Sequence, residues 1–114
     1  MAKYERRLTG NFHEVLLMCE EAIVKGSISA SFEAGSDFRV GEARVSVRVY
    51  ERFSYLGGNR VSLNMTLAGE GNDLYLSAIT SGGSQAMFFK INTIGEENFL
   101  NALKKEIERK FPYR

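Results

Sequence analysis

The chain has 114 residues, the length of one domain with a single hydrophobic core. Apolar residues make up 44% of it and charged residues 25%, which is typical of a folded domain rather than a disordered segment. Fifteen basic against fourteen acidic residues leave a net charge of +1, which excludes a generally basic nucleic-acid-binding protein. One cysteine excludes an internal disulfide, and no segment has the pattern of a signal peptide or a membrane span. We therefore expect a cytoplasmic protein with one domain covering residues 1–114.

The N-terminal part predicts a short strand over residues 4–8, followed by a helix. Asn11 and Glu14 form a typical N-terminal capping pair, and Gly26 is a typical helix end. Between them the apolar residues recur at the spacing of one helix face: Phe12, Val15, Leu16, Cys19, Ala22 and Ile23.

The middle of the chain predicts β structure. Four segments alternate apolar and polar residues with the period of a half-buried strand: 27–34, 44–53, 60–67 and 74–79. Glycine-rich turns at 57–59 and 69–72 separate the later segments. Consecutive alternating strands with short turns indicate an antiparallel meander with one buried face.

The C-terminal part predicts a second helix from near Gly95 to about Lys110, with acidic residues at its start and basic residues at its end. Residues 86–91 are compatible with either a strand or an irregular segment. The predicted fold class is therefore α+β, an antiparallel sheet of about five strands in the order β-α-β-β-β-β-α. Both helices are expected to pack on one face of the sheet. This arrangement resembles the TATA-binding-protein-like architecture, and it also approaches the helix-grip domains, which normally use more strands.

A distinctive segment runs from Ser81 to Lys90 and continues through Thr93, 95–97 and 99–100. It resembles a small family of uncharacterised bacterial proteins, and the resemblance covers nearly the whole chain. It implies a bacterial, cytoplasmic origin and an unknown function. It carries over no catalytic residues.

The residues predict no catalytic site, no cofactor site and no metal site. His13-Glu14 begins like a zinc-protease motif, but Leu17 stands where the second histidine is needed. A single histidine and a single cysteine cannot form a metal cluster, and Cys19 is expected to be a small buried hydrophobic residue. One glycine-rich loop is a candidate anion site, although a simple sharp turn explains it better: Ser81, Gly82, Gly83 and Ser84.

The polar face of the sheet is the main candidate for function. If Val45, Val47 and Val49 are buried, the intervening side chains should point away from the core. The candidate residues on this face are Arg44, Arg48, Tyr50, Arg52, Arg60 and Tyr75.

Three interpretations of this face remain open. The first is an ordinary solvated sheet surface. The second is a homodimer or a protein partner, because arginine and tyrosine are typical interface residues. The third is a small anionic or amphipathic ligand, with nucleic acid the weaker form because the chain is nearly neutral. We expect a non-catalytic module that acts by self-association or by binding a protein partner, and not at a membrane.

Overall fold

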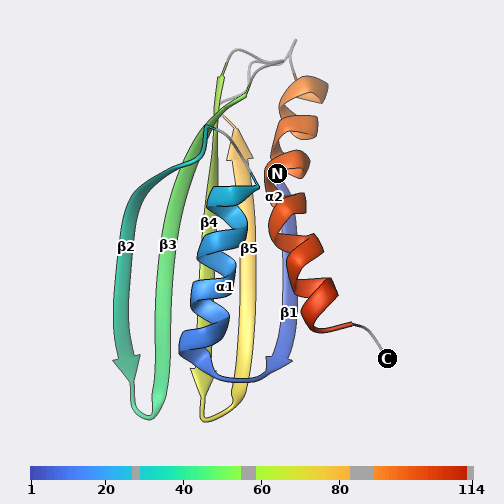
Figure 1. The fold of residues 1–114 in the computed structure, drawn as a ribbon. Coiled ribbons are helices and arrows are strands. Elements are labelled where there is room, and N and C mark those ends of the chain that lie inside the picture. Colours follow the sequence, from blue (N-terminus) through green and yellow to red (C-terminus); the bar gives the residue numbers. More distant parts are fainter. Residues whose placement is uncertain (27–28, 55–58, 83–88, 113–114) are drawn as a thin grey trace.

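A computed structural model describes residues 1–26, 29–54, 59–82 and 89–112. Its elements in chain order are β1 (Ala2–Thr9), α1 (Phe12–Lys25), β2 (Ser31–Val40), β3 (Ala43–Ser54), β4 (Asn59–Glu70), β5 (Asp73–Gly82) and α2 (Phe89–Lys110). The strands form one antiparallel sheet in the order β1-β5-β4-β3-β2, and both helices lie on the same face of it (Figure 1). This confirms the predicted α+β class and order of elements. No helix in the described part of the chain is long and apolar enough to cross a membrane.

Helix α1 has the ends that the sequence predicts. The Asn11 side chain accepts a hydrogen bond of 2.9 Å from the backbone N–H of Glu14, and the N–H of Gly26 donates to the carbonyl of Ala22 at 3.0 Å. Gly26 also permits a close approach of the two helices, because a Cβ atom there would lie 2.1 Å from the Cβ of Ala102 in α2. The glycine therefore ends one helix and makes room for the other.

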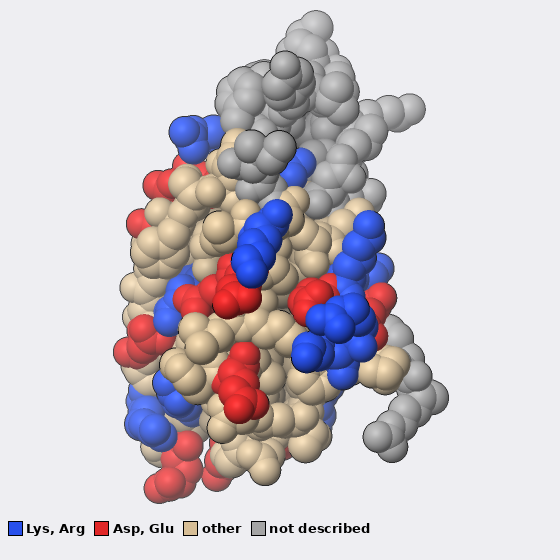
Figure 2. All heavy atoms as spheres, viewed as in Figure 1, with Lys and Arg blue, Asp and Glu red and all other residues tan. Residues whose placement is uncertain are grey.

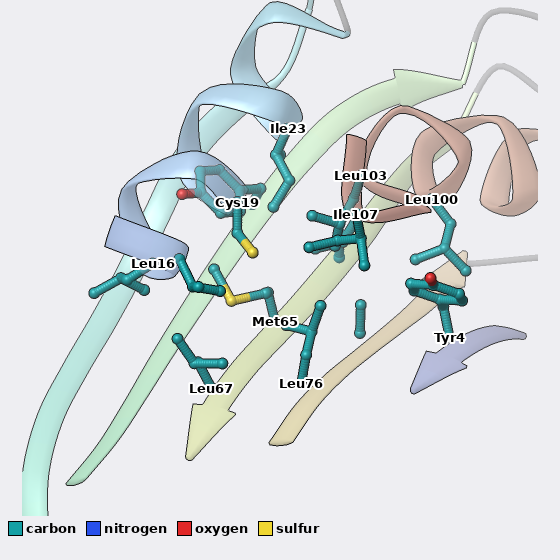
Figure 3. Close-up of a cluster of buried hydrophobic side chains, with 14 of the residues drawn as sticks. Tyr4, Leu16, Cys19, Ile23, Met65, Leu67, Leu76, Leu100, Leu103 and Ile107 are labelled. Atoms are coloured by element: carbon teal, nitrogen blue, oxygen red, sulfur yellow. The ribbon is translucent and has the colours of Figure 1, made fainter. Parts of the chain in front are cut away.

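The core lies between the two helices and the inner strands. Figure 3 shows side chains of α1 and α2 meeting those of β1, β4 and β5. The labelled members of this buried cluster are Tyr4, Leu16, Cys19, Ile23, Met65, Leu67, Leu76, Leu100, Leu103 and Ile107. Strand β2 contributes no residue to it, and Tyr50 is the one contribution of β3 among the described residues. The core is thus centred on one side of the sheet, and β2 extends beyond the helix layer (Figure 1).

Strand β2 corrects the prediction of a strand over residues 27–34. It runs instead from Ser31 to Val40, with a register shift between Phe32 and Ala34, and residues 27 and 28 lie outside the described ranges. All ten of its residues are exposed, so burial imposed no simple alternation on them. The short turn at Gly41, where φ is +60°, joins β2 to β3 as a hairpin.

Helix α2 begins at Phe89, earlier than the predicted start near Gly95. Residues 89–91 are therefore helical, and 86–88 lie outside the described residues. Of the candidate anion loop, Ser81 and Gly82 end strand β5, and Gly83 and Ser84 are not among the described residues.

Candidate functional site: the outer strands β2 and β3

The register of β3 on β4 reverses the face predicted for the arginines. Directly opposed residues of antiparallel strands share a face, and Arg48 is opposite Met65 while Tyr50 is opposite Leu63. Met65 and Leu63 are fully buried beneath the helices. The prediction that these side chains point away from the core is therefore wrong for four residues: Arg44, Arg48, Tyr50 and Arg52. The remaining two, Arg60 and Tyr75, do lie on the open face.

Two arginines of β3 cover the rim of the core, which explains the reversal. The Arg44 guanidinium lies 4.4 Å from the ring centre of Phe12, and that of Arg52 lies 5.2 Å from the ring centre of Phe99. Long side chains can place their stems on apolar rings and still carry a charge outward. Arginine therefore suits the helix side of a strand at the edge of the helix layer.

Arg48 forms the centre of an ionic cluster that joins α1, β2 and β3. Its Nε donates to a Glu20 carboxylate oxygen at 2.8 Å, and its Nη2 donates to Asp37 at 2.9 and 3.2 Å. Its Nη1 donates to the carbonyl of Val47 at 2.9 Å. The side chain is only 12% exposed. An anion at Arg48 would have to displace these acceptors. The guanidinium therefore has a structural role, in which it links α1 to the outer strands.

Asp37 completes the cluster from the outer strand. It accepts a 2.5 Å hydrogen bond from the Ser46 hydroxyl in addition to those from Arg48. These hydrogen bonds, that of Ser46 first, lower the pKa of Asp37 below its ordinary value. Asp37 is therefore ionised at neutral pH and is already bound within the chain.

A groove of about 430 Å³ lies over this cluster, between α1 and the outer strands. The Phe32 ring, 57% exposed, packs edge-on against Tyr50 with the ring centres 5.8 Å apart, and Gly35 leaves space beneath it. Burial of the hydroxyl, and to a smaller extent the negative charge of Glu20, raise the pKa of Tyr50 to about 12, so the hydroxyl stays protonated. Within the described ranges, no group of three or more His, Cys, Asp or Glu residues is arranged to hold a metal ion.

The open face of the outer strands is largely apolar, with Ser36 opposite Val47 as a polar residue within it. The valines predicted to be buried lie on this face, beside the apolar residues of β2 that share it. We call this surface the outer apolar band; it comprises Ala34, Phe38, Val40, Val45, Val47 and Val49. The same face of β4 and β5 is mixed: it carries the polar residues Asn64, Thr66 and Ser77 together with the exposed apolar residues Tyr75 and Ile79.

One sequence signal could have located β2 correctly. Val40 and Ala43 flank a turn that contains Gly41, with alternating residues on either side, which is the usual hairpin pattern. No sequence pattern marks Glu20 and Asp37 as partners of Arg48, because all three come from different elements.

This geometry defines a small α+β domain in which the helices cover one face of the sheet and leave the outer strands uncovered. The chain belongs to a family of unknown function (DUF6054), whose model matches residues 1–110. The predicted resemblance to an uncharacterised family is thereby confirmed. The comparison with curated proteins gives no match.

A crystal structure of TTHA0849 from Thermus thermophilus is similar to this chain at 12% sequence identity. The match covers 96% of this chain and 98% of that one, with a TM-score of 0.31. A score this low does not assign the fold to a known architecture, and the resemblance to the TATA-binding-protein-like architecture is not confirmed.

Proposed function

We propose that this chain is a non-catalytic interaction module that associates with a second copy through the outer strands β2 and β3. The observation that carries the proposal is the outer apolar band. The helices do not cover this face, and Phe38 and Val40 are 47% and 66% exposed. Adjacent exposed apolar residues are typical of an interaction surface, whereas single scattered ones need no explanation.

The continuity of the band across two strands supports this proposal over an ordinary solvated sheet. On β4 and β5, polar residues such as Asn64 and Ser77 separate the exposed apolar residues Tyr75 and Ile79, as expected of a solvated face. On β3 the valines Val45, Val47 and Val49 occupy the open face, and the polar residues Arg48 and Ser46 occupy the helix side. The sequence places its valines where folding of the single chain does not bury them fully.

The predicted alternative of an anionic ligand has less support. The donors of Arg48 are bound by Glu20, Asp37 and a backbone carbonyl. On the face shown in Figure 2, acidic and basic residues are intermixed, which does not favour a nucleic-acid surface. Association of two near-neutral chains requires neither a free arginine nor a basic surface.

Two variants on the same open face test the proposal. Phe38→Asp places a charge in the outer apolar band, and Ile79→Asp places the same charge on β5 at a residue 39% exposed. We expect sedimentation velocity over a range of concentrations to show a weakened dimer for Phe38→Asp only. A wild-type protein that stays monomeric, or equal effects of the two variants, would contradict the proposal.

A further inference from the structure

We infer that the two copies pack face to face, with the outer apolar band of one sheet lying on that of the other. This inference rests on the proposed function and names the geometry of the same surface. The helices occupy the opposite face of the sheet (Figure 1), so a second sheet can approach the open face of β2 and β3. The layers of the dimer are then helices, sheet, sheet and helices, with the two sheets about 10 Å apart.

The edge of β2 is poorly suited to the alternative, in which two sheets join side by side. Its ladder with β3 shifts register between Phe32 and Ala34, where Glu33 is the extra residue. Farther along, the strand carries the charged residues Asp37 and Arg39. Bulges and charged side chains are the usual devices that keep an edge strand from pairing. Edge pairing would also leave the outer apolar band in water, because the band lies on the face of the sheet.

The chemistry of the outer apolar band fits a second copy better than other occupants. Its members are all alanine, valine or phenylalanine, so the band offers no charge to an ion or a nucleic acid. A sheet face is flat, whereas small-molecule sites are concave. Beside the band on the same face, Glu51 and Arg60 already pair with each other at 3.3 Å. An identical face therefore brings apolar surface onto apolar surface and buries no unpaired charge.

A twofold axis that runs between β2 and β3, parallel to both, gives the band an apolar partner along its length. The axis places β2 of one copy over β3 of the other at the same level. Neighbours within one sheet, such as Phe38 and Val45, then also face each other between the two sheets. The same holds for Val40 with Ala43. Each contact occurs twice, and the pairing is isologous, so it closes at two copies.

An axis across the strands at the level of Val47 fits less well. It would place Glu51 of one copy over Ala43 of the other, a carboxylate on an apolar side chain, twice. With the axis along the strands, Glu51 lies over Ser31, its neighbour within the sheet, whose hydroxyl can donate a hydrogen bond. Two strands from each copy make a small interface, so we expect a reversible dimer rather than an obligate one.

Lysine substitutions on two strands test the packing in the full chain. Val47 lies on β3, one strand in from the edge, so a lysine there enters a face-to-face interface but not an edge-to-edge one. We expect Val47→Lys to raise the dimer Kd about tenfold or more in sedimentation velocity, because each dimer would bury two unpaired charges. Ser77→Lys is the matched control, at the same level of the open face but on β5.

Hydrogen exchange of the wild-type protein gives an independent readout that needs no variant. In a face-to-face dimer the edge of β2 stays in water. Its amides that do not bond to β3 should therefore exchange as fast at high protein concentration as at low concentration. Edge-to-edge pairing would instead slow their exchange, because they would donate hydrogen bonds to the partner.

The variant Ala43→Lys distinguishes the two axes. With the axis along the strands the new lysine lies over Val40 of the other copy, so the dimer Kd should rise. With the axis across the strands it would meet Glu51, and the Kd should fall. A lower Kd for this variant overturns the proposed axis.

The remaining outcomes separate this inference from the proposed function. A dimer that is weakened by Phe38→Asp but not by Val47→Lys overturns face-to-face packing and leaves the proposed function standing. A dimer in which the edge amides of β2 become protected does the same. Equal effects of Val47→Lys and Ser77→Lys overturn both, because the interface would not be confined to the outer strands. A chain that stays monomeric at every concentration also overturns both.

Discussion

The placement of Arg48 on the helix side of β3 makes a prediction about stability that an outward-facing arginine would not make. Arg48→Met keeps most of the aliphatic stem and removes the guanidinium. The change breaks the bonds to Glu20 on α1 and to Asp37 on β2, and thus the ionic link between the helix layer and the outer hairpin.

The magnitude follows from the exposure of the three side chains. Arg48 is 12% exposed and Glu20 29%, so their bond is partly shielded, and a charged hydrogen bond of this kind contributes about 1.5 kcal/mol. Asp37 is 60% exposed, so its contact is screened and contributes about 0.5 kcal/mol. The expected loss is about 2 kcal/mol in the free energy of unfolding. For a domain of this size the melting temperature should fall by about 5–10 °C.

Denaturant and thermal unfolding measure this loss, with Arg60→Met as the control. Arg60 lies on the open face, where its pair with Glu51 at 3.3 Å is exposed, and its loss should cost less than about 0.5 kcal/mol. Both variants are compared at a low protein concentration, so that association does not contribute. If Arg60→Met destabilises the protein as much as Arg48→Met, the assignment of faces on β3 is wrong.

Three further predictions concern pH, packing and thiol reactivity. The pKa of Asp37 is lowered in the folded state, so its carboxylate stabilises the fold above the ordinary value of 3.8, and that stability is lost as the pH falls below it. Asp37→Asn should therefore flatten the acid side of a stability–pH curve measured by urea unfolding, and an unchanged slope would argue against the Ser46 and Arg48 bonds. Gly26→Ala should cost about 1–3 kcal/mol in thermal unfolding, because the new Cβ would overlap Ala102; a neutral effect would mean that the helices are further apart. Burial raises the pKa of Cys19 to about 12, so a thiol reagent should label it only as fast as the protein opens. Rapid labelling without denaturant would contradict its burial.

The sequence predicted well those elements that the core specifies on one face. In helix α1 the N-cap, the apolar face and the terminal glycine all indicate the same helix. Strands β4 and β5 bury the alternating apolar residues of the sequence pattern, such as Leu63 and Leu76. Strand β1 was expected over residues 4–8, and the structure extends it to Ala2–Thr9 at an edge of the sheet. In each case a buried surface constrains the residues directly.

The outer strands could not be predicted in the same way. Alternation in β3 gives the period of a strand but not the side that the helices cover, so Val47 and Arg48 exchange the faces expected of them. Strand β2 is exposed throughout, and a register shift near Glu33 breaks the period. The ionic cluster depends on Glu20, Asp37 and Arg48 meeting from three elements, which only the fold brings together.

Native mass spectrometry of the untagged wild-type protein over a range of concentrations tests the central claim most directly. The account predicts a species of twice the 12.8 kDa chain mass with no retained small molecule, its fraction rising with concentration. A bare monomer at every concentration would contradict self-association through the outer strands. A monomer that retains a compound would redirect attention to the groove between α1 and β2.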